Sequence, residues 1–258
     1  MEAAVTLKQR GFDVVVFDKR DEIGGNLHVA KKPPFKGKFE WAIDYYKSMA
    51  KKLNITMKLG KEVTAQEVLA LKPYSILVAT GSNVISIPLE GLDQVQTVQA
   101  HDVLANDMQF ANKKVVVIGG GITGLETALY INRQGTNQVS VVDMLPEWPV
   151  DMLDMRYQNE ALLEVRHCND QGVALFYNNK VVKFADGKLF IESTKDGEVK
   201  ELPADVIVLS VGVKPNDALW QELLASGHPS VWKAGDAIAT GKINKAVLHG
   251  SKFGYSLN

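Results

Sequence analysis

The chain has 258 residues, 46% of them hydrophobic and 23% charged, with 29 basic against 30 acidic residues. This length can hold two domains of ordinary size, and the even charge balance offers no basic surface for nucleic acid. The single cysteine, Cys168, excludes an intramolecular disulfide and a cysteine-bound metal cluster, so we expect no metal. No apolar run approaches the ~20 residues of a membrane-spanning helix. No signal peptide is visible, so we expect a cytoplasmic protein without membrane contact.

The beginning of the chain predicts a helix followed by a strand. Residues 1–11 have helical character and end in glycine, and residues 13–18 read as a strand that ends in aspartate. Two adjacent glycines, Gly24 and Gly25, come next. They indicate either a close approach of the backbone to a ligand or a simple turn.

After a loop with two prolines at 31–38, the sequence predicts a longer helix at residues 39–52. Its Trp41, Tyr45 and Met49 recur at helical spacing, and we expect them in the core rather than on a binding surface. The elements that follow are expected to be a strand at 55–59, a helix at 65–71, a buried strand at 74–82 and a connection at 95–106.

The central stretch, residues 115–143, carries the most specific pattern. An apolar run of four residues, typical of a strand buried on both faces, leads into Gly119, Gly121 and Gly124 at the spacing G-x-G-x-x-G. A helix to residue 134 and a second strand ending in Asp143 follow. In this arrangement the glycines admit a pyrophosphate at the helix N-terminus, and the acid hydrogen-bonds an adenosine ribose. No Arg or Lys follows Asp143 directly, which favours NAD over NADP.

The chain repeats part of this unit. Residues 125–135 and residues 1–11 both predict eleven-residue helices that end in glycine and precede a strand ending in Asp. In this register Gly124 aligns with the position before Met1. We therefore expect an N-terminally truncated chain, in which the first strand and its glycine loop are missing. The alternative is a native start in which Met1 simply opens a helix.

The rest of the chain returns to strands and helices. We expect a long helix at 152–171 and an antiparallel excursion of three strands, 173–176, 181–184 and 189–193. We expect strands in the segment 205–212, which ends in glycine, and in the segment 230–237, which contains a glycine followed by an acid. A last helix is expected at 243–255. His167 and Cys168 are expected to be packing or surface residues. No Ser, Cys or acid accompanies the histidines at a triad spacing, so we name no catalytic residue.

Taken together, the motifs resemble the two-dinucleotide flavoproteins of the pyridine nucleotide–disulfide oxidoreductase superfamily. The resemblance covers essentially the whole chain, and its branch is most similar to the C-terminal half of NADH:flavin oxidoreductases of the 2-enoate and 2,4-dienoyl-CoA reductase type. The motifs that carry it, in the order of that family, are Glu2-Ala3-Ala4, Asp18-Lys19, Gly24-Gly25-Asn26-Leu27, Ala79-Thr80-Gly81, residues 119–124 and Ala234-Gly235-Asp236-Ala237.

The resemblance implies an α/β protein with two Rossmann-like domains: an FAD domain at 1–107 and 215–258, and an NAD domain inserted at 108–214. The residues it implies for NAD are Gly119, Gly121, Ile122, Thr123, Gly124, Asp143 and Gly212. The residues it implies for FAD are Asp18 and Lys19 at the ribose, Gly25, Asn26 and Leu27 along the diphosphate and flavin, Val63 at the adenine, Thr80 and Gly81 near the diphosphate, Gly235 and Asp236 at the ribityl chain, and Lys245 and Ala246 facing the flavin ring.

The implied function is that of an NADH-dependent flavin oxidoreductase module. It would pass electrons from NADH through FAD to an FMN and iron–sulfur barrel domain, or to a separate acceptor, for enoate or dienoyl-CoA reduction. Two alternatives remain open: a non-enzymatic remnant that binds NAD alone, which the missing glycine loop favours, and an electron-transfer flavoprotein subunit of another complex. The absence of a Cys-x-x-Cys pair disfavours a disulfide reductase.

Overall fold

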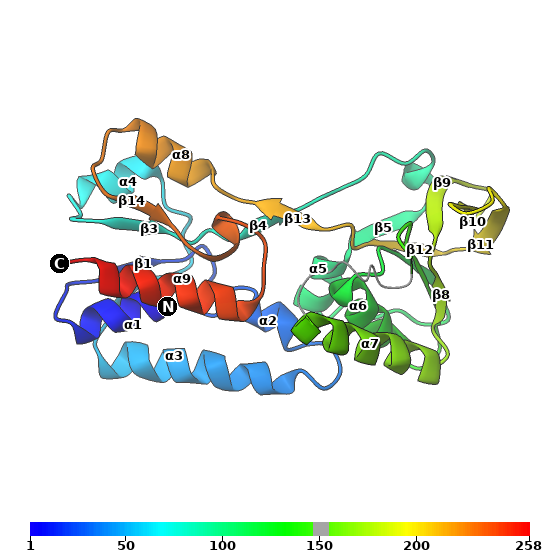
Figure 1. Cartoon of the computed structure of the whole chain (residues 1–258), viewed down its shortest axis with the longest axis horizontal. Helices are drawn as coiled ribbons and strands as arrows, with labels where there is room; N and C mark the ends of the chain where they lie inside the picture. Colours follow the sequence, from blue (N-terminus) through cyan, green and yellow to red (C-terminus); the bar gives the residue numbers. More distant parts are fainter. Residues whose placement is uncertain (147–154) are drawn as a thin grey trace. The chain divides into compact units, whose positions relative to one another are not determined.

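The computed structural model describes residues 1–146 and 155–258 (Figure 1). They form two compact units. The first consists of Met1–His28, Lys38–Asn83 and Val213–Asn258, and the second of Val29–Gly37 and Val84–Gly212. Residues 29–37 and 84–107 therefore pack with the second unit, whereas the expected NAD domain begins at 108. The division into an FAD and an NAD domain stays a prediction.

The second unit is built on a five-stranded parallel sheet in the order β5-β12-β6-β7-β8. Its strands are β5 (Gln96–Gln99), β6 (Lys114–Ile118), β7 (Gln138–Val142), β8 (Ala174–Phe176) and β12 (Val206–Leu209). All four residues of β12 and the last four of β6 are buried, as a strand covered on both faces requires. The predicted α/β class with a parallel sheet is thereby confirmed.

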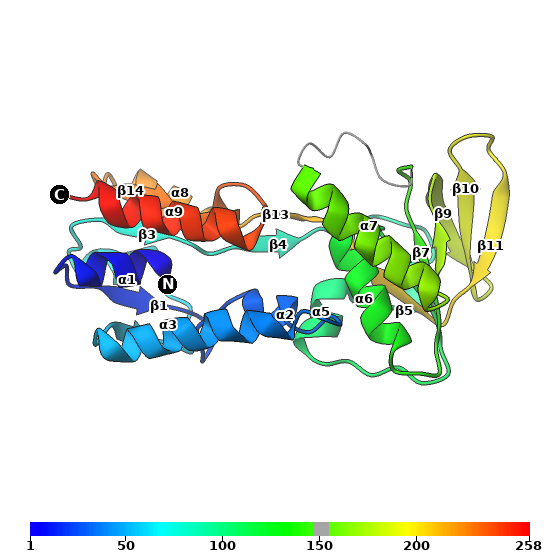
Figure 2. The same cartoon turned by 60° about the horizontal axis from the view of Figure 1, so that its bottom comes forward.

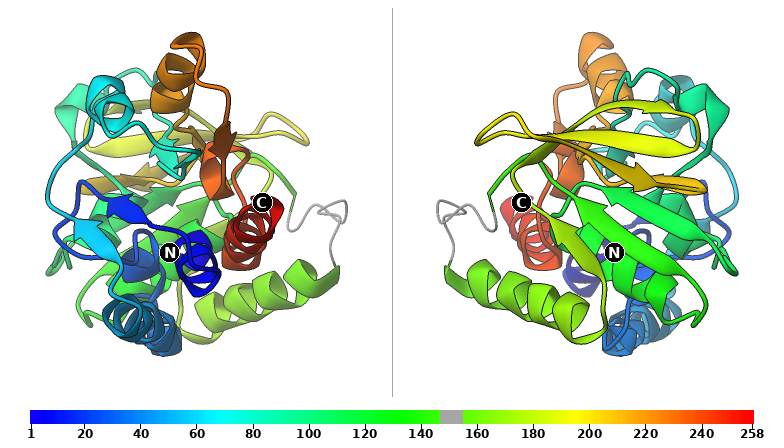
Figure 3. Two further views of the ribbon diagram at one scale, coloured as in Figure 1. Left: turned by 90° about the vertical axis from the view of Figure 1, so that its left-hand side faces the viewer. Right: turned by 90° about the vertical axis from the view of Figure 1, so that its right-hand side faces the viewer.

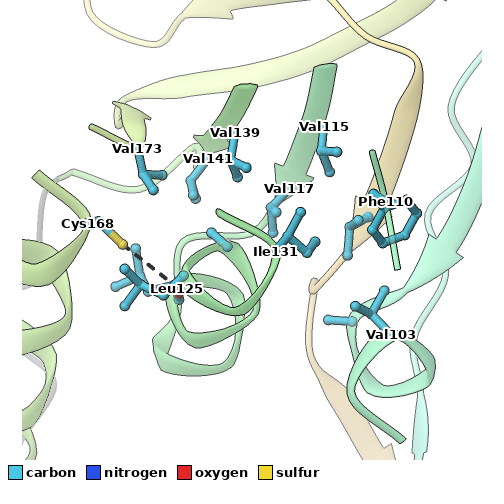
Figure 4. Packing of buried hydrophobic residues seen from close by; sticks show 14 of the residues in the cluster. Val103, Phe110, Val115, Val117, Leu125, Ile131, Val139, Val141, Cys168 and Val173 are labelled. Carbon is cyan, nitrogen blue, oxygen red and sulfur yellow. Dashed lines mark hydrogen bonds between the residues drawn. The ribbon is translucent and has the colours of Figure 1, made fainter. Parts of the chain in front are cut away.

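Three helices, α5 (Ala100–Ala105), α6 (Ile122–Asn132) and α7 (Met155–Asp170), share a hydrophobic core with this sheet. Figure 4 shows valines of β6 and β7 facing Leu125 and Ile131 of α6. The thiol of Cys168 on α7 lies in the same core, 3.8 Å from the carbonyl oxygen of Leu125. The predicted start of α7 at 152 lies outside the described residues. No helix in the described ranges is long and apolar enough to cross a membrane.

A three-stranded antiparallel sheet covers the other face of the parallel sheet (Figure 3, right), and a second apolar cluster joins the two. It consists of β9 (Asn179–Ala185), β10 (Lys188–Ser193) and β11 (Val199–Pro203). Asp186 and Gly187 form its first turn with φ of 50° and 73°, the backbone that a two-residue hairpin favours.

The sequence expectation for this excursion was wrong in one strand. Residues 174–176 form β8, which pairs in parallel with β7, because α7 provides the crossover that a parallel connection needs. The third antiparallel strand is β11 instead. Four of its five residues are exposed, so it carries no hydrophobic alternation that could have revealed it.

The first unit holds two short parallel pairs, β1 (Val15–Phe17) with β2 (Thr56–Lys58), and β3 (Ile76–Val78) with β14 (Val231–Lys233). Helices α1 (Glu2–Gln9) and α9 (Ile243–Ser256) pack side by side (Figure 2). At Gly254 of α9 a Cβ atom would lie 2.7 Å from Thr6 of α1, so this close approach depends on glycine. The other elements of the first unit are α2 (Leu27–Ala30), α3 (Glu40–Lys52), α4 (Ala65–Ala70), β4 (Ser82–Val84), β13 (Val213–Pro215) and α8 (Ala218–Ala225). Strand β13 pairs with β4, and α2 continues into the second unit.

Helix α3 buries a different face from the one expected. Ile43 is fully buried, whereas Trp41 is 68% exposed and Tyr45 50% exposed. Tyr46 and Met49 join Ile43 at the i+3 and i+6 positions and pack toward Val5 and Ile55. The helical period was right, but the two aromatic residues were assigned to the wrong side of the helix.

The predicted repeat is visible in both units. Gly11 and Gly135 end their helices with φ of 89° and 96°, and each helix leads into a parallel strand, β1 or β7. In the second unit β6 lies between β7 and β12. In the first unit no described strand occupies the matching position between β1 and β3, and Val15 of β1 is 43% exposed, against 4% for Val139 of β7.

Candidate dinucleotide sites

The fingerprint loop connects β6 to α6 at the carboxyl edge of the parallel sheet. Gly119 has a φ of 107°, and a Cβ atom there would lie 2.3 Å from the carbonyl oxygen of Ser210. A Cβ atom at Gly124 would lie 1.9 Å from the carbonyl oxygen of Gly119. Both glycines are therefore required by the packing of the chain itself.

Gly121 is different from its two neighbours in the motif. It is the N-cap of α6, its backbone is extended, with φ −67° and ψ 173°, and nothing lies within 4 Å of a Cβ atom placed there. The internal packing of the chain thus gives no reason for glycine at this position. Open space beside a helix N-terminus, where backbone N–H groups are unpaired, fits the approach of a pyrophosphate.

Asp143 closes the loop from the neighbouring strand. Its Oδ2 accepts a hydrogen bond from the Gly120 amide at 2.6 Å, and its Oδ1 accepts one from the Leu145 amide at 2.8 Å. Each carboxylate oxygen keeps a second acceptor site, so the side chain can still bind a ribose hydroxyl. The sequence assigned Asp143 to the ribose alone and missed its bond to Gly120.

The other residues predicted for NAD lie around the same loop. Ile122 and Thr123 form the first turn of α6, and the Thr123 carbonyl accepts a hydrogen bond from the buried Thr127 hydroxyl. Gly212, with a φ of 103°, follows β12 two residues after Ser210, whose carbonyl faces Gly119. The structure therefore gathers the set at one sheet edge, and it adds Ser210, which carries no sequence signal.

In the first unit, the residues predicted for FAD fall into two groups. The first is arranged by Arg20, whose amide donates to Asp18 Oδ1 at 3.0 Å and whose guanidinium donates to the Gly25 carbonyl at 2.6 Å. Gly25 itself has a φ of 52°. Lys19 is next to Asp18, and Asn26 and Leu27 continue from Gly25 into α2. Arg20 was missed by the sequence, because nothing in its neighbours indicates which carbonyl it reaches.

The second group joins the end of β3 to the start of α9. Thr80 Oγ1 donates to the Asn216 carbonyl, and the Gly81 carbonyl accepts from the Asn216 amide at 3.0 Å. Asp236 Oδ1 accepts from the Gly241 amide at 3.0 Å, and its Oδ2 lies 3.5 Å from the Ser82 hydroxyl.

The start of α9 closes this second group. The Gly235 amide donates to His249 Nδ1 at 3.2 Å. A Cβ atom at Gly235 would lie 3.4 Å from the Cβ of Ala246, and Lys245 is in the same first turn of α9. Val63 lies next to the start of α4 and packs against the cluster of Val68, Ile76, Val78 and Leu223.

The described residues of the first unit thus fit the ribose, ribityl and flavin ends of an FAD. The second unit places β6, a glycine loop and α6 in sequence, which fits the pyrophosphate of a dinucleotide.

The model of the pyridine nucleotide-disulphide oxidoreductase family matches residues 1–248. The chain belongs to this family. The predicted superfamily is thereby confirmed, and with it the cofactor pair of FAD and NAD(P) that the family uses.

Similar proteins place the chain within larger members of the family. It is 30% identical to an NADH oxidase of Thermoanaerobacter brockii, and the match covers 100% of this chain and 39% of that protein. It is 34% identical to a bilirubin reductase of Mediterraneibacter gnavus, and the match covers 84% of this chain and 32% of that protein. It superimposes on 2-naphthoyl-CoA reductase with a TM-score of 0.89 at 28% identity, covering 100% of this chain and 38% of that one. The chain therefore spans less than two fifths of the length of these relatives.

A likeness to thioredoxin reductase of T. acidophilum concerns the fold alone. The TM-score is 0.67 at 19% identity, and the match covers 98% of this chain and 92% of that one. Both comparisons fit the two-unit α/β architecture described above.

Proposed function

We propose that the second unit binds NADH and that the first unit holds FAD, so that the chain forms the NADH-oxidising module of a larger reductase. The observation that carries this proposal is Gly121, which stands open at the N-terminus of α6 between two glycines that packing explains. The family supplies the chemistry: a reduced nicotinamide gives a hydride to the flavin. The domain bounds predicted from the sequence, 1–107 with 215–258 for FAD and 108–214 for NAD, differ from these two units at residues 29–37, 84–107 and 213–214.

The residues of the second unit would orient the nucleotide. Amides at the start of α6, Ile122 and Thr123 among them, face the phosphates, and the helix dipole favours their negative charge. The Asp143 carboxylate would accept a hydrogen bond from a free ribose 2′-hydroxyl and repel a 2′-phosphate. Met144 and Leu145 follow it without a cation, so NADH is the expected donor rather than NADPH.

In the first unit, Arg20 would hold the loop of Gly25 in the conformation that faces the diphosphate and flavin. Asp236, near Ser82 and the Gly241 amide, would accept a hydroxyl of the ribityl chain.

A second candidate is a module that binds NAD without FAD. The fingerprint loop and Asp143 both belong to the second unit, so nucleotide binding there does not require a flavin in the first unit. A flavin-free protein that still binds NADH would distinguish this candidate from the first.

The electron acceptor is proposed from the names of the relatives. Bilirubin reductase, cinnamate reductase and 2-naphthoyl-CoA reductase match this chain over about a third of their own length. We infer that a further part, such as an FMN and iron–sulfur barrel, receives the electrons for enoate or acyl-CoA reduction, or that the chain serves as an electron-transfer subunit of another complex. A cytoplasmic location is part of the same proposal.

Calorimetric titration of the purified chain with NADH and NADPH tests the nucleotide assignment. We expect NADH to bind at least about tenfold more tightly, which corresponds to about 1.4 kcal/mol. Gly121→Val should abolish binding, because a branched side chain would occupy the space of the pyrophosphate, while the unfolding temperature should stay close to that of the parent. Normal NADH binding by a folded Gly121→Val variant would show that the fingerprint is not the nucleotide site.

A further inference from the structure

Residues Val29–Gly37 form a strap on the second unit. Both of their neighbours in the chain, His28 and Lys38, belong to the first unit, but the strap itself packs with α6 and α7. These two helices lie side by side (Figure 2). The sequence predicts only a loop here, so its contacts are a finding of the structure.

Lys36 enters a socket of three carboxylates. Its Nζ lies 2.8 Å from Glu160 Oε1, 3.0 Å from Glu126 Oε1 and 3.7 Å from Glu164 Oε1. Glu126 belongs to α6, and the other two are one turn apart on α7. The side chains of Lys36 and Glu126 are 17% and 13% exposed and that of Glu164 5%, whereas Glu160 is 32% exposed. Most of the cluster is thus shielded from solvent, and its electrostatic interactions are stronger than those of a surface pair.

Two further residues of the strap, both before Lys36 in the chain, contact the second unit. Lys32 Nζ contacts Asp107 Oδ2 at 2.5 Å. The Phe35 ring lies 5.0 Å from the His167 ring and 4.5 Å from the Arg133 guanidinium. Phe35 also has a φ of 68°, an unfavourable conformation for this residue, and it lies directly before Lys36. A strained backbone is retained where other contacts over-determine it, as they do here.

The socket has an excess of negative charge. One lysine faces three glutamates, and His167 Nδ1 lies 3.7 Å from Glu164 Oε2. Burial raises the pKa of Glu126 and outweighs the opposing charge and hydrogen bond of Lys36, while the charges of Glu164 and Glu160 add smaller upward shifts. Burial tends to lower the pKa of Lys36, but hydrogen bonds and charge from Glu160 and Glu126 outweigh it and raise the pKa. The lysine therefore stays charged while it keeps the carboxylates together.

The socket lies directly behind the fingerprint. Glu126 is two residues after Gly124 and four after Ile122, which begins α6, so it is about 6 Å along the helix axis from the N-terminus. An unneutralised carboxylate at that distance would oppose the binding of a pyrophosphate, because the interaction lies within one Debye length at moderate salt.

We propose that Lys36 is a positioning residue of the dinucleotide site: it locks the strap onto α6 and α7 and offsets part of the negative charge of the socket behind the fingerprint. This inference rests on the proposed binding of NADH by the second unit. It identifies a cation remote in sequence from the motif as a determinant of dinucleotide affinity. The lock itself does not depend on the nucleotide and can be measured without it.

Hydrogen exchange of the strap and NADH titration of the full chain test the two parts. In Lys36→Met we expect the amides of residues 29–37 to exchange at least about tenfold faster. We expect the NADH dissociation constant to rise about fivefold at low salt, and the difference to shrink at high salt because the effect is electrostatic. Lys188→Met, which removes an exposed pair with Glu201, is the matched control and should change neither quantity.

A triple variant, Lys36→Met with Glu126→Gln and Glu160→Gln, keeps the test decisive if the single variant does not fold. In the triple variant the strap should still exchange fast, but the NADH affinity should return to within about twofold of that of the parent. The conservative variant Lys36→Arg should behave like the parent in both measurements. A protected strap in either lysine-free variant overturns the lock. An unchanged NADH affinity in folded Lys36→Met overturns the charge argument. Failure of the parent chain to bind NADH would overturn the proposed function, while the exchange of the strap would still decide the lock.

Discussion

Replacement of Asp143 tests two roles of one side chain. In the structure its two oxygens accept hydrogen bonds from different amides, those of Gly120 and Leu145. Alanine removes both bonds. Asparagine has one oxygen and one NH2 group, so it can accept from only one amide and places a donor against the other. The two variants should therefore differ in a graded way.

The size of the effect follows from these contacts. A hydrogen bond to a charged group contributes about 1.5–3 kcal/mol, and the lower figure applies because Asp143 is only half-buried. Asp143→Asn should thus lose about 1.5 kcal/mol of stability and Asp143→Ala about 3 kcal/mol. For a protein of this size, the first corresponds to a fall in melting temperature of about 3–6 °C and the second to about twice that.

Nucleotide titration supplies the second readout. Loss of the carboxylate removes the repulsion of a 2′-phosphate, so the preference for NADH over NADPH should fall from at least about tenfold toward unity in both variants. Thermal unfolding without nucleotide separates the structural role from the binding role. If Asp143→Asn is as stable as the parent, the bonds to the two amides do not hold the loop, and the geometric argument fails.

Three further outcomes are expected. Gly124→Ala should fail to form a stable second unit, because its Cβ atom would lie 1.9 Å from the Gly119 carbonyl oxygen, and circular dichroism during heating will show whether it does. Residues 1–258 expressed alone should hold well below one flavin per molecule, and the same polypeptide with a strand and a Gly-x-Gly-x-x-Gly loop added before Met1 should be yellow; full flavin content in residues 1–258 alone would contradict this. Burial, aided by the charge of Glu164, raises the pKa of Cys168 to about 12, whereas the pKa of the unfolded thiol is about 8.5. The unfolded chain therefore loses this proton first, and the free energy of unfolding should fall as the pH rises above about 8.5. A thiol reagent should then react with Cys168 only on unfolding, and rapid reaction in the folded protein would contradict its burial.

The parts of the fold that could be predicted are those with a local signal. The buried strands β6 and β12 are continuous apolar runs, and the glycine spacing after β6 indicates a tight loop before α6. The repeated helix that ends in glycine could also be predicted, because the left-handed conformation at positions 11 and 135 favours glycine.

The rest depends on partners that are distant in sequence. Lys36 belongs to a loop rich in lysine and proline, and its three carboxylates lie 90 or more residues away, so no local pattern indicates the socket. The two aromatic residues of α3 have the spacing of a buried face, but the neighbouring face, with Ile43, is the one that packs. Strand β11 is polar and pairs through its backbone, which side-chain patterns do not report.

The unequal roles of the three fingerprint glycines bear on how such motifs are read in other chains. A protein that no longer bound nucleotide would still need glycine at the positions of Gly119 and Gly124, because those two are fixed by the contact between strand, loop and helix. Only the position of Gly121 could then accept other residues without a clash inside the chain. The residue equivalent to Gly121 is therefore the diagnostic one when a degenerate relative is to be separated from a working enzyme, and this chain retains glycine there.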